Sequence, residues 1–393
     1  MENVVRKWDK VYCELLKQIL NEGELMHNRT GIDTISIEGV NFKLDVLEEF
    51  PILETKKVLV KNALSEILWI HQAQSNDVSW LQARGNHVWD EWKIDEDGIY
   101  RIYEPSGEYN PEKEVDLLDL DGNVIYKDSK PYKVKSLIEG KTIKSAKFFG
   151  KEYAGTIGTA YGWINNKFKK PQSVLHTLKN NPNDRRMNII LWQDEYIRTA
   201  VLPSCVWSIE FKVSKGRLHG YVHQRSADVP LGLPFNVSQY AILLAMFAKV
   251  SGLEVGNLNW SIMDAHIYVN QLDGIKKQID RYEEMLELEK LSDIEILKKY
   301  NETLFKYNSL KENIISELDL EILGLMEEKI MLYELMMTKE KPVLYLEDKE
   351  DFFKFSNEVI NDKEYLKENI TGNDDIKILK YKSAPFIKMP IAQ

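Results

Sequence analysis

The segment FNVSQYAILLAMFAKVSGL, residues 235–253, strongly constrains how this chain can fold. Its apolar residues fall on nearly every side of the helix that it predicts, whereas a surface helix has a polar face. Such a helix must be covered by other elements on all sides. We therefore expect a central, buried helix.

Patterns before and after this segment supply the surrounding elements. Residues 3–22 have apolar side chains at helical spacing. Residues 57–74 (KVLVKNALSEILWIHQAQ) predict an apolar helix with one carboxylate, Glu66, inside it. Alternating residues after NRTG, and the run NIILWQ after the turn NPNDRRM, predict strands. Helices and strands are therefore mixed along the chain.

Two segments have a different composition. Residues 98–155 are rich in Gly, Pro, Asp and Lys and contain DLDGNVIY, so we predict a peripheral insert with a β-hairpin. Residues 281–338 contain no proline, and the apolar spacing from Leu297 to Ile314 resembles a coiled-coil seam. With a break near residues 319–324, this segment predicts a helical hairpin that packs on itself or on a partner.

Charge and cysteine content exclude some classes of protein. A formal net charge of −10 argues against broad, sequence-blind binding of nucleic acid, although a small basic pocket for one phosphate is compatible with it. Two cysteines provide no disulfide framework.

The N-terminus lacks the apolar core of a signal peptide, and we expect no run long enough to span a bilayer. We therefore predict a soluble, cytoplasmic protein.

Cys205, in LPSCVWSIE, has two interpretations. It is either a reactive nucleophile or a small apolar residue at the start of a strand. Cys13 lies in the N-terminal helix beside the apolar Tyr12, and we expect it to be structural because unassisted thiols in helices are usually inert.

The segment HQRSADVPLGLPFN holds the densest group of polar candidates. Arg225 and Ser226 are able to hold phosphate oxygens, although an isolated pair of this kind is usually solvated. Asp228 follows two residues later. Asn236 stands just before the apolar helix, where it could instead be a helix cap.

Further candidates are spread along the chain. The pair Arg185–Arg186 is either a second cationic site or a surface turn with salt bridges. His266 and Tyr268, in DAHIY, would point to the same side of a strand, although a core histidine is common. Glu66 must be paired, hydrated or catalytic, because burying an uncompensated carboxylate is costly. Together these residues are compatible with covalent chemistry on a phosphorylated small molecule.

Several motifs resemble the folate-dependent thymidylate synthase family. QRSADVPLGLPFN, LPSC, DAHIY, WDEW, NRTG, the DRR turn and IKMPIA occur in that family's order from about residue 27 to the C-terminus. The resemblance implies an α+β fold over residues 1–393, a single domain in which a mixed β-sheet packs with helices. The hairpin-containing insert at about 98–155 and the long helical insert at 281–338 would interrupt it.

The resemblance also implies an activity. Members of the family convert dUMP to dTMP and take both a one-carbon unit and a hydride from 5,10-methylenetetrahydrofolate, with no metal. Cys205 matches the nucleophile that adds to C6 of the pyrimidine, which makes C5 nucleophilic. Arg225 is the natural cation to favour its thiolate. Asn236 matches the residue that reads uracil by donating to O4 and accepting from N3–H, whereas relatives that act on dCMP carry Asp there.

The family's remaining roles fall on matching positions of this chain. The implied catalytic residues are Cys205, Glu66, Tyr161, Arg225, Asp228 and Asn236. The implied dUMP-binding residues are Arg29, Arg185, Arg186, Gln224, Arg225, Ser226, Asp228, Asn236, His266 and Tyr268. The implied folate-binding residues are Lys56, Trp89, Trp92, Asp228, Leu231, Gly232, Phe235 and Ala392. The partner of an obligate homodimer would donate Arg185 and Arg186, and neither a membrane nor a nucleic acid is implied.

Departures from the family pattern keep alternatives open. Val206 follows the nucleophile where many relatives have His, and Gln393 replaces a more apolar C-terminus. A deoxyuridylate hydroxymethylase would share the covalent step but let water add to the one-carbon unit; Trp89 and the C-terminal lid favour hydride transfer. An inactive nucleotide-binding scaffold that uses its helical arm is the third possibility.

Overall fold

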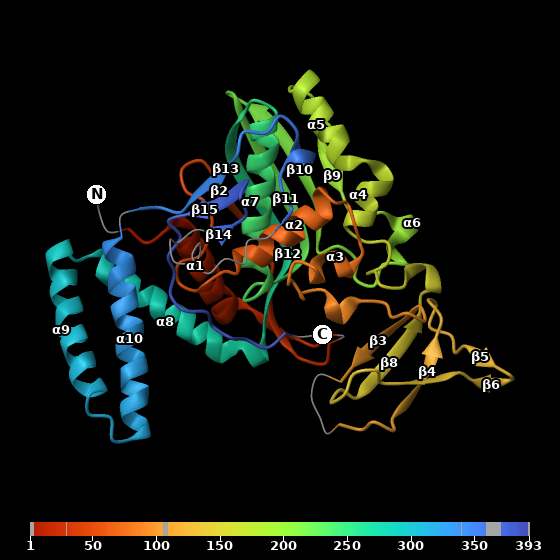
Figure 1. The fold of residues 1–393 in the computed structure, drawn as a ribbon, viewed down its shortest axis with the longest axis horizontal. Helices are drawn as coiled ribbons and strands as arrows, with labels where there is room; N and C mark the ends of the chain where they lie inside the picture. The colour runs from red at the N-terminus through yellow and green to blue at the C-terminus, as the bar shows by residue number, and fades with distance from the viewer. Residues whose placement is uncertain (1–3, 29, 105–108, 339, 359–370, 392–393) are drawn as a thin grey trace.

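A six-stranded mixed sheet lies at the centre of the protein (Figure 1). We describe it from a computed structural model covering residues 4–28, 30–104, 109–338, 340–358 and 371–391. The strand order is β1-β2-β12-β11-β10-β9. Among the described strands of this sheet, β11 and β12 pair in parallel and the other neighbouring pairs are antiparallel. The strands are β1 (Glu24–Met26), β2 (Thr34–Asp45), β9 (Asn188–Ile190), β10 (Val206–Ser214), β11 (Arg217–Asp228) and β12 (Glu254–Tyr268).

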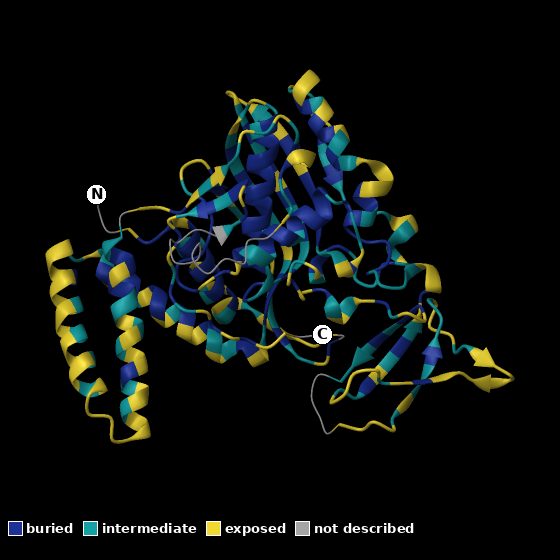
Figure 2. Ribbon diagram, in the orientation of Figure 1, coloured by how far each residue is buried: buried dark blue, intermediate teal, exposed yellow. Residues whose placement is uncertain are grey.

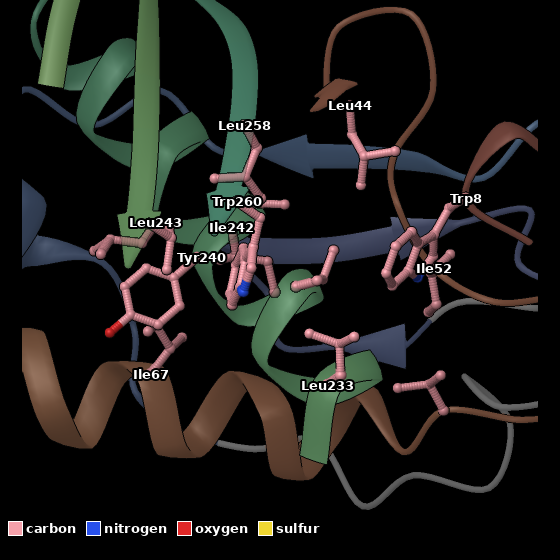
Figure 3. Close-up of a cluster of buried hydrophobic side chains, with 14 of the residues drawn as sticks. Trp8, Leu44, Ile52, Ile67, Leu233, Tyr240, Ile242, Leu243, Leu258 and Trp260 are labelled. Carbon is pink, nitrogen blue, oxygen red and sulfur yellow. The ribbon is translucent and has the colours of Figure 1, made fainter. Parts of the chain in front are cut away.

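The predicted central helix is confirmed as α7 (Gly232–Val250). It packs against β11, β12 and α2 (Val60–His71). Figure 3 shows Tyr240 and Leu243 of α7 in the same buried cluster as Trp260 of β12. We expected no run long enough to span a bilayer, and this was wrong: judged only by its length and composition, α7 could cross a membrane. However, 83% of its apolar window is buried inside the protein, as in a core helix.

Shorter elements complete the main body. The amphipathic helix α1 (Lys7–Glu22) buries Trp8 and Tyr12 beneath β2 and β12. A small three-stranded sheet has the order β13-β15-β14. The other elements of the body are α3 (Val78–Gln82), η1 (Asp90–Trp92), α4 (Gly162–Phe168), α5 (Lys170–Asn180), α6 (Asp194–Ile197), η3 (Val269–Gln271), β13 (Val343–Leu346), η4 (Phe352–Lys354), β14 (Thr371–Gly372) and β15 (Ile376–Leu379).

The segment predicted as a peripheral insert has its own sheet and its own small core, which Figure 2 shows as buried residues between exposed ribbons. Its entry and exit cross at Gly98 and Gly150, where a Cβ on Gly98 would lie 2.4 Å from the Gly150 carbonyl carbon. The predicted hairpin turn is confirmed, since Leu118 pairs with Val124. The elements are β3 (Ile99–Tyr103), β4 (Glu114–Leu118), β5 (Tyr126–Lys127), β6 (Lys130–Pro131), β7 (Lys133–Lys135), β8 (Ile143–Phe148) and η2 (Lys151–Tyr153).

Most of the long helical segment, residues 293–337, projects from the opposite side of the body (Figure 1). The segment consists of α8 (Leu272–Glu289), α9 (Asp293–Lys311) and α10 (Glu317–Met337), and α9 packs against α10. A hairpin is therefore present, but the predicted break at 319–324 was wrong. The break lies at residues 312–316, because Ser316 and Asp319 form a capping box that starts α10.

Candidate active site

A cavity of about 360 Å³ brings together most of the predicted site residues. They come from separate parts of the chain but meet where the parallel strands β11 and β12 end, beside the N-terminus of α7. The register pairs Asp228 with His266 at these ends. The predicted residues that line the cavity are Glu66, Trp89, Trp92, Tyr161, Cys205, Gln224, Arg225, Ser226, Asp228, Gly232, Asn236, His266 and Tyr268.

Cys205 lies immediately before β10. Arg225 of β11 contacts it through both its backbone and its side chain. The Arg225 backbone nitrogen donates to the Cys205 carbonyl at 2.9 Å. Its guanidinium donates to the carbonyls of Ser204 and Pro203 and places Nη2 3.6 Å from the Cys205 sulfur. The guanidinium therefore fixes the loop that carries the thiol, and its charge lies where it favours a thiolate.

Tyr161 contacts the same loop from the other side. Its hydroxyl accepts a 3.0 Å hydrogen bond from the Cys205 backbone nitrogen. Burial and the nearby Cys205 raise the pKa of Tyr161 well above its usual value. Its backbone has φ 47° and ψ −105°, a conformation that non-glycine residues rarely adopt. The next residue, Gly162, lets the backbone of this turn lie close to Ser75, because a Cβ at Gly162 would be only 2.0 Å from the Ser75 carbonyl oxygen.

Glu66 is held by two donors, so it is a paired carboxylate. Trp89 Nε1 donates to its Oε1 and Gln239 Nε2 to its Oε2, each at 2.7 Å. Burial raises the pKa of Glu66, and these two hydrogen bonds oppose the rise because they stabilise the ionised form. The carboxyl group therefore lines the cavity in a fixed orientation and with a raised pKa.

A chain of side-chain hydrogen bonds runs from Trp260 through Asn236 to Glu66. Trp260 Nε1 donates to Gln224 Oε1 at 3.0 Å, and Gln224 Nε2 donates to Asn236 Oδ1 at 3.2 Å. Asn236 Nδ2 then donates to Gln239 Oε1 at 3.1 Å, and Gln239 donates to Glu66. We call these five residues the amide relay.

The relay fixes the orientation of Asn236. The Trp260 indole only donates, so the oxygen of Gln224 must face it and the nitrogen must face Asn236. At the other end, the Glu66 carboxylate accepts. Both ends therefore require the same assignment, with an Asn236 oxygen that accepts and a nitrogen that donates. Asn236 lies inside α7, which begins at Gly232, so the helix-cap alternative was wrong.

On the other side of the cavity, Asp264 connects three polar side chains. It accepts from Ser226 Oγ at 3.0 Å and from Ser36 Oγ at 2.5 Å, and His266 Nδ1 lies 3.3 Å away. Burial opposes ionisation of Asp264, but the hydrogen bonds from His266, Ser36 and Ser226 outweigh it and lower its pKa to about 2. Ser226, whose hydroxyl we predicted to hold a phosphate, thus donates to the Asp264 carboxylate in this structure.

Asp228 ends β11 and is held by the turn that follows it. Its Oδ1 accepts from the Leu231 backbone nitrogen at 3.0 Å. Burial raises the pKa of Asp228, although the hydrogen bond from Leu231 opposes the rise. This places a carboxyl oxygen beside Gly232, which also lines the cavity.

Some predicted residues lie elsewhere. Among the described residues, Leu231, Phe235 and Lys56 are outside the cavity lining. Lys56 is buried and donates to the Pro230 carbonyl, and burial lowers its pKa to about 8. Val206, the departure from the family pattern, is only 3% exposed and belongs to the core.

The paired arginines also lie away from this cavity. Arg185 lines a separate cavity on the sheet, and the largely exposed Arg186 pairs with Asp184 at 2.7 Å. Within one chain they form the surface turn that we kept as an alternative. Arg29 and Ala392 fall outside the described residues.

Our sequence reasoning missed Gln239, Trp260 and Asp264. Asp264 had a signal, because it precedes His266 by two residues and so shares its face of the strand. Gln239 follows Asn236 by three residues on one helix, which also makes them neighbours. The indole of Trp260 had no local signal.

Comparisons with known proteins point to one family. A thymidylate synthase family profile matches residues 10–317. Thymidylate synthase from Clostridium beijerinckii is 35% identical over 274 residues, which is 70% of this chain and 82% of the relative. The enzyme from Mycoplasma mobile is 32% identical over 303 residues, covering 76% of this chain and 93% of the relative. The fold is similar to thermostable thymidylate synthase A from Bacillus subtilis, with a TM-score of 0.60 and 25% identity over 98% of this chain and 99% of the other. The chain therefore belongs to the thymidylate synthase family.

Proposed function

We propose that this protein is a thymidylate synthase, a methyltransferase that converts dUMP to dTMP with 5,10-methylenetetrahydrofolate as co-substrate. Dihydrofolate is the second product, and the reaction passes through a covalent Cys205–dUMP adduct. The observation that carries the proposal is the pairing of a thiol beside a guanidinium with an asparagine oriented for uracil in one cavity.

The proposed chemistry starts at Cys205. Its thiolate sulfur bonds to C6 of dUMP, and the electron pair of the C5–C6 double bond moves to C5 and O4. C5 then bonds the methylene carbon of the folate, whose bonds to the folate nitrogens break, and C5 loses its proton to a base. The folate supplies the hydride that completes the methyl group. The sulfur–C6 bond breaks as the double bond returns, which regenerates the thiolate.

Two side chains assist the proton transfers. Tyr161 lies beside Cys205 with a raised pKa, so its hydroxyl stays protonated and able to order the base or a water. Glu66 lies at the end of the amide relay and exchanges protons with the base or with ordered water.

Base selection follows from the orientation of Asn236. The oxygen that accepts from Gln224 has a second lone pair for uracil N3–H, and the nitrogen that donates to Gln239 has a second hydrogen for O4. Cytosine presents a donor at C4 and an acceptor at N3. Binding cytosine would require the Asn236 amide to flip against the relay.

We further propose an obligate homodimer in which the partner supplies Arg185 and Arg186 to the dUMP phosphate. Tyr221 pairs in register with Asn259, and the two lie on one sheet face with Met263, which is 65% exposed. Arg185 lines a second cavity, separate from the candidate active site, on this face of the sheet. Arg29, Arg225 and Ser226 would bind the phosphate from the first chain. We place the enzyme in the cytoplasm and assign no metal.

Product analysis tests the proposal. The protein is incubated with dUMP and 5,10-methylenetetrahydrofolate, and both products are identified. We expect dTMP with dihydrofolate. Formation of 5-hydroxymethyl-dUMP with tetrahydrofolate would instead identify a hydroxymethylase, and no turnover would favour the scaffold.

A further inference from the structure

The C-terminal segment runs antiparallel along one face of α8. Gln271 precedes the helix and contacts Pro390, and Gly274 faces Met389, where an added Cβ would lie 2.7 Å from Met389 Cγ. Further along, Arg281 Nη1 donates to the Pro385 carbonyl at 2.9 Å. The spacing 271, 274 and 281 keeps all three contacts on one side of the helix.

Gln271 makes the contact nearest the cavity, and it is only 1% exposed. Its Nε2 donates at 3.2 Å both to Asp228 Oδ2 and to the Pro390 carbonyl. Its Oε1 accepts from the Tyr268 backbone nitrogen, also at 3.2 Å. One amide thus joins a carboxylate in the cavity, the strand end that carries Tyr268, and the C-terminal segment.

The chemistry of the partners fixes this amide. A carboxylate and a carbonyl only accept, and the Tyr268 backbone nitrogen only donates, so the nitrogen of Gln271 must face the first two and its oxygen the third. The residue after Pro390, Ile391, lines the cavity and is 61% exposed. Gln271 therefore holds the C-terminal segment where that segment closes one side of the cavity.

We propose that Gln271 is a positioning residue that ties Asp228 to the C-terminal segment and so sets how this segment lies over the folate side of the cavity. The assignment of a folate side rests on the proposed function. Gln271 does not itself touch the reacting atoms; it acts through Asp228 and Pro390.

The sharpest variant is Gln271→Glu. A glutamate has the same length and still accepts from Tyr268, but its carboxylate repels Asp228 and the Pro390 carbonyl. We expect kcat/KM for methylenetetrahydrofolate to fall about 10-fold or more, because a buried polar contact is lost and replaced by repulsion. The KM for dUMP should change by a smaller factor than the folate parameters, because Gln271 reaches the nucleotide only through Asp228 and the Tyr268 backbone. Gln271→Met, which lacks both donors, should affect the folate parameters in the same direction and provides the test if Gln271→Glu does not fold.

Gln278→Met is the matched control. Gln278 is a fully buried glutamine of α8 whose Nε2 donates to Thr55 Oγ1. Replacing it removes a buried amide from the helix that follows Gln271 without touching Asp228 or Pro390. We expect kcat/KM for the folate to stay close to the wild-type value in this variant.

Deuterium uptake by the C-terminal peptide reports directly whether Gln271 holds this segment, whereas the difference between the folate and dUMP kinetics reports a role beyond structure. In the ligand-free protein we expect faster exchange over residues 385–391 in both Gln271 variants and wild-type exchange in Gln278→Met. Equal exchange and equal folate kinetics in all four proteins would overturn the inference, as would equal losses in the Gln271 and Gln278 variants. If the wild type forms no dTMP, the proposed function fails, and the ligand-free exchange alone decides this inference.

Discussion

Gln239 Nε2 lies 2.7 Å from Glu66 Oε2, and this contact links the buried carboxyl group to the amide of Asn236 through one side chain. Gln239 also accepts from Asn236. A single side chain therefore helps to orient the amide of Asn236, which we propose selects the base, and to stabilise the ionised form of Glu66.

Replacing Gln239 should alter the pH dependence of turnover. In Gln239→Met, Glu66 loses a donor that favours its ionised form, so its pKa should rise further above its usual value. If Glu66 acts as a proton acceptor, kcat should then decline at a higher pH than in the wild type as pH falls. The kcat–pH profiles of both proteins measure this shift. Gln72→Met is the control, since Gln72 donates to the carbonyls of Phe352 and Phe355; an identical shift there would contradict the relay.

Asn236→Asp should change the choice of base. A carboxylate cannot donate to uracil O4, whereas it can accept from the C4 amino group of cytosine. We expect kcat/KM for dUMP to fall about 100-fold or more, with preference moving toward dCMP. Steady-state kinetics with both nucleotides measure the ratio. Unchanged discrimination would show that Asn236 does not read the base.

The two cysteines should differ in reactivity. Burial raises the pKa of Cys13 well above its usual value and covers its sulfur completely, whereas Cys205 is partly exposed beside Arg225. Iodoacetamide at pH 7 should therefore alkylate Cys205 and leave Cys13 unmodified in the native protein. Peptide mass spectrometry locates the label, and the Cys205→Ser protein is the control. Labelling of Cys13 at a similar rate would contradict this account.

Stability should depend on pH through His71. Burial lowers the pKa of His71 from 6.5 to about 3, so the unfolded chain binds a proton that the folded protein excludes. The unfolding free energy should therefore fall as pH drops from 6.5 toward 3, by up to roughly 5 kcal/mol from this group.

The His71→Phe variant isolates that contribution. Phenylalanine preserves an aromatic contact with Tyr240 but binds no proton. Urea unfolding at several pH values should show a shallower loss of stability in acid than for the wild type. Equal slopes for the two proteins would show that His71 does not contribute.

Local sequence patterns were sufficient for some features and not for others. The all-round apolar character of α7 predicted a buried central helix, and the alternation in DAHIY predicted a shared face for His266 and Tyr268. The predicted break at residues 319–324 was wrong because Gly324, a residue that often ends a helix, is exposed and tolerated within α10. The Ser316 capping box was the better signal.

The amide relay and the Gln271 contacts could not be predicted locally. The hydrogen bond between Trp260 and Gln224 joins residues 36 positions apart, and the one between Gln271 and Pro390 spans 119 positions. Such contacts depend on strand register and on the path of the C-terminal segment. The motif resemblance located the residues of the cavity, but it carried no information on the partners that orient them.

Trapping the covalent adduct tests the central claim most directly. With 5-fluoro-dUMP and 5,10-methylenetetrahydrofolate, the fluorine at C5 cannot leave as a proton does, so the sulfur–C6 bond should persist. We predict an increase in protein mass equal to both ligands, located on the peptide that contains Cys205 and absent in Cys205→Ser. No stable increase, or an increase on a peptide without Cys205, would contradict the assignment of the nucleophile.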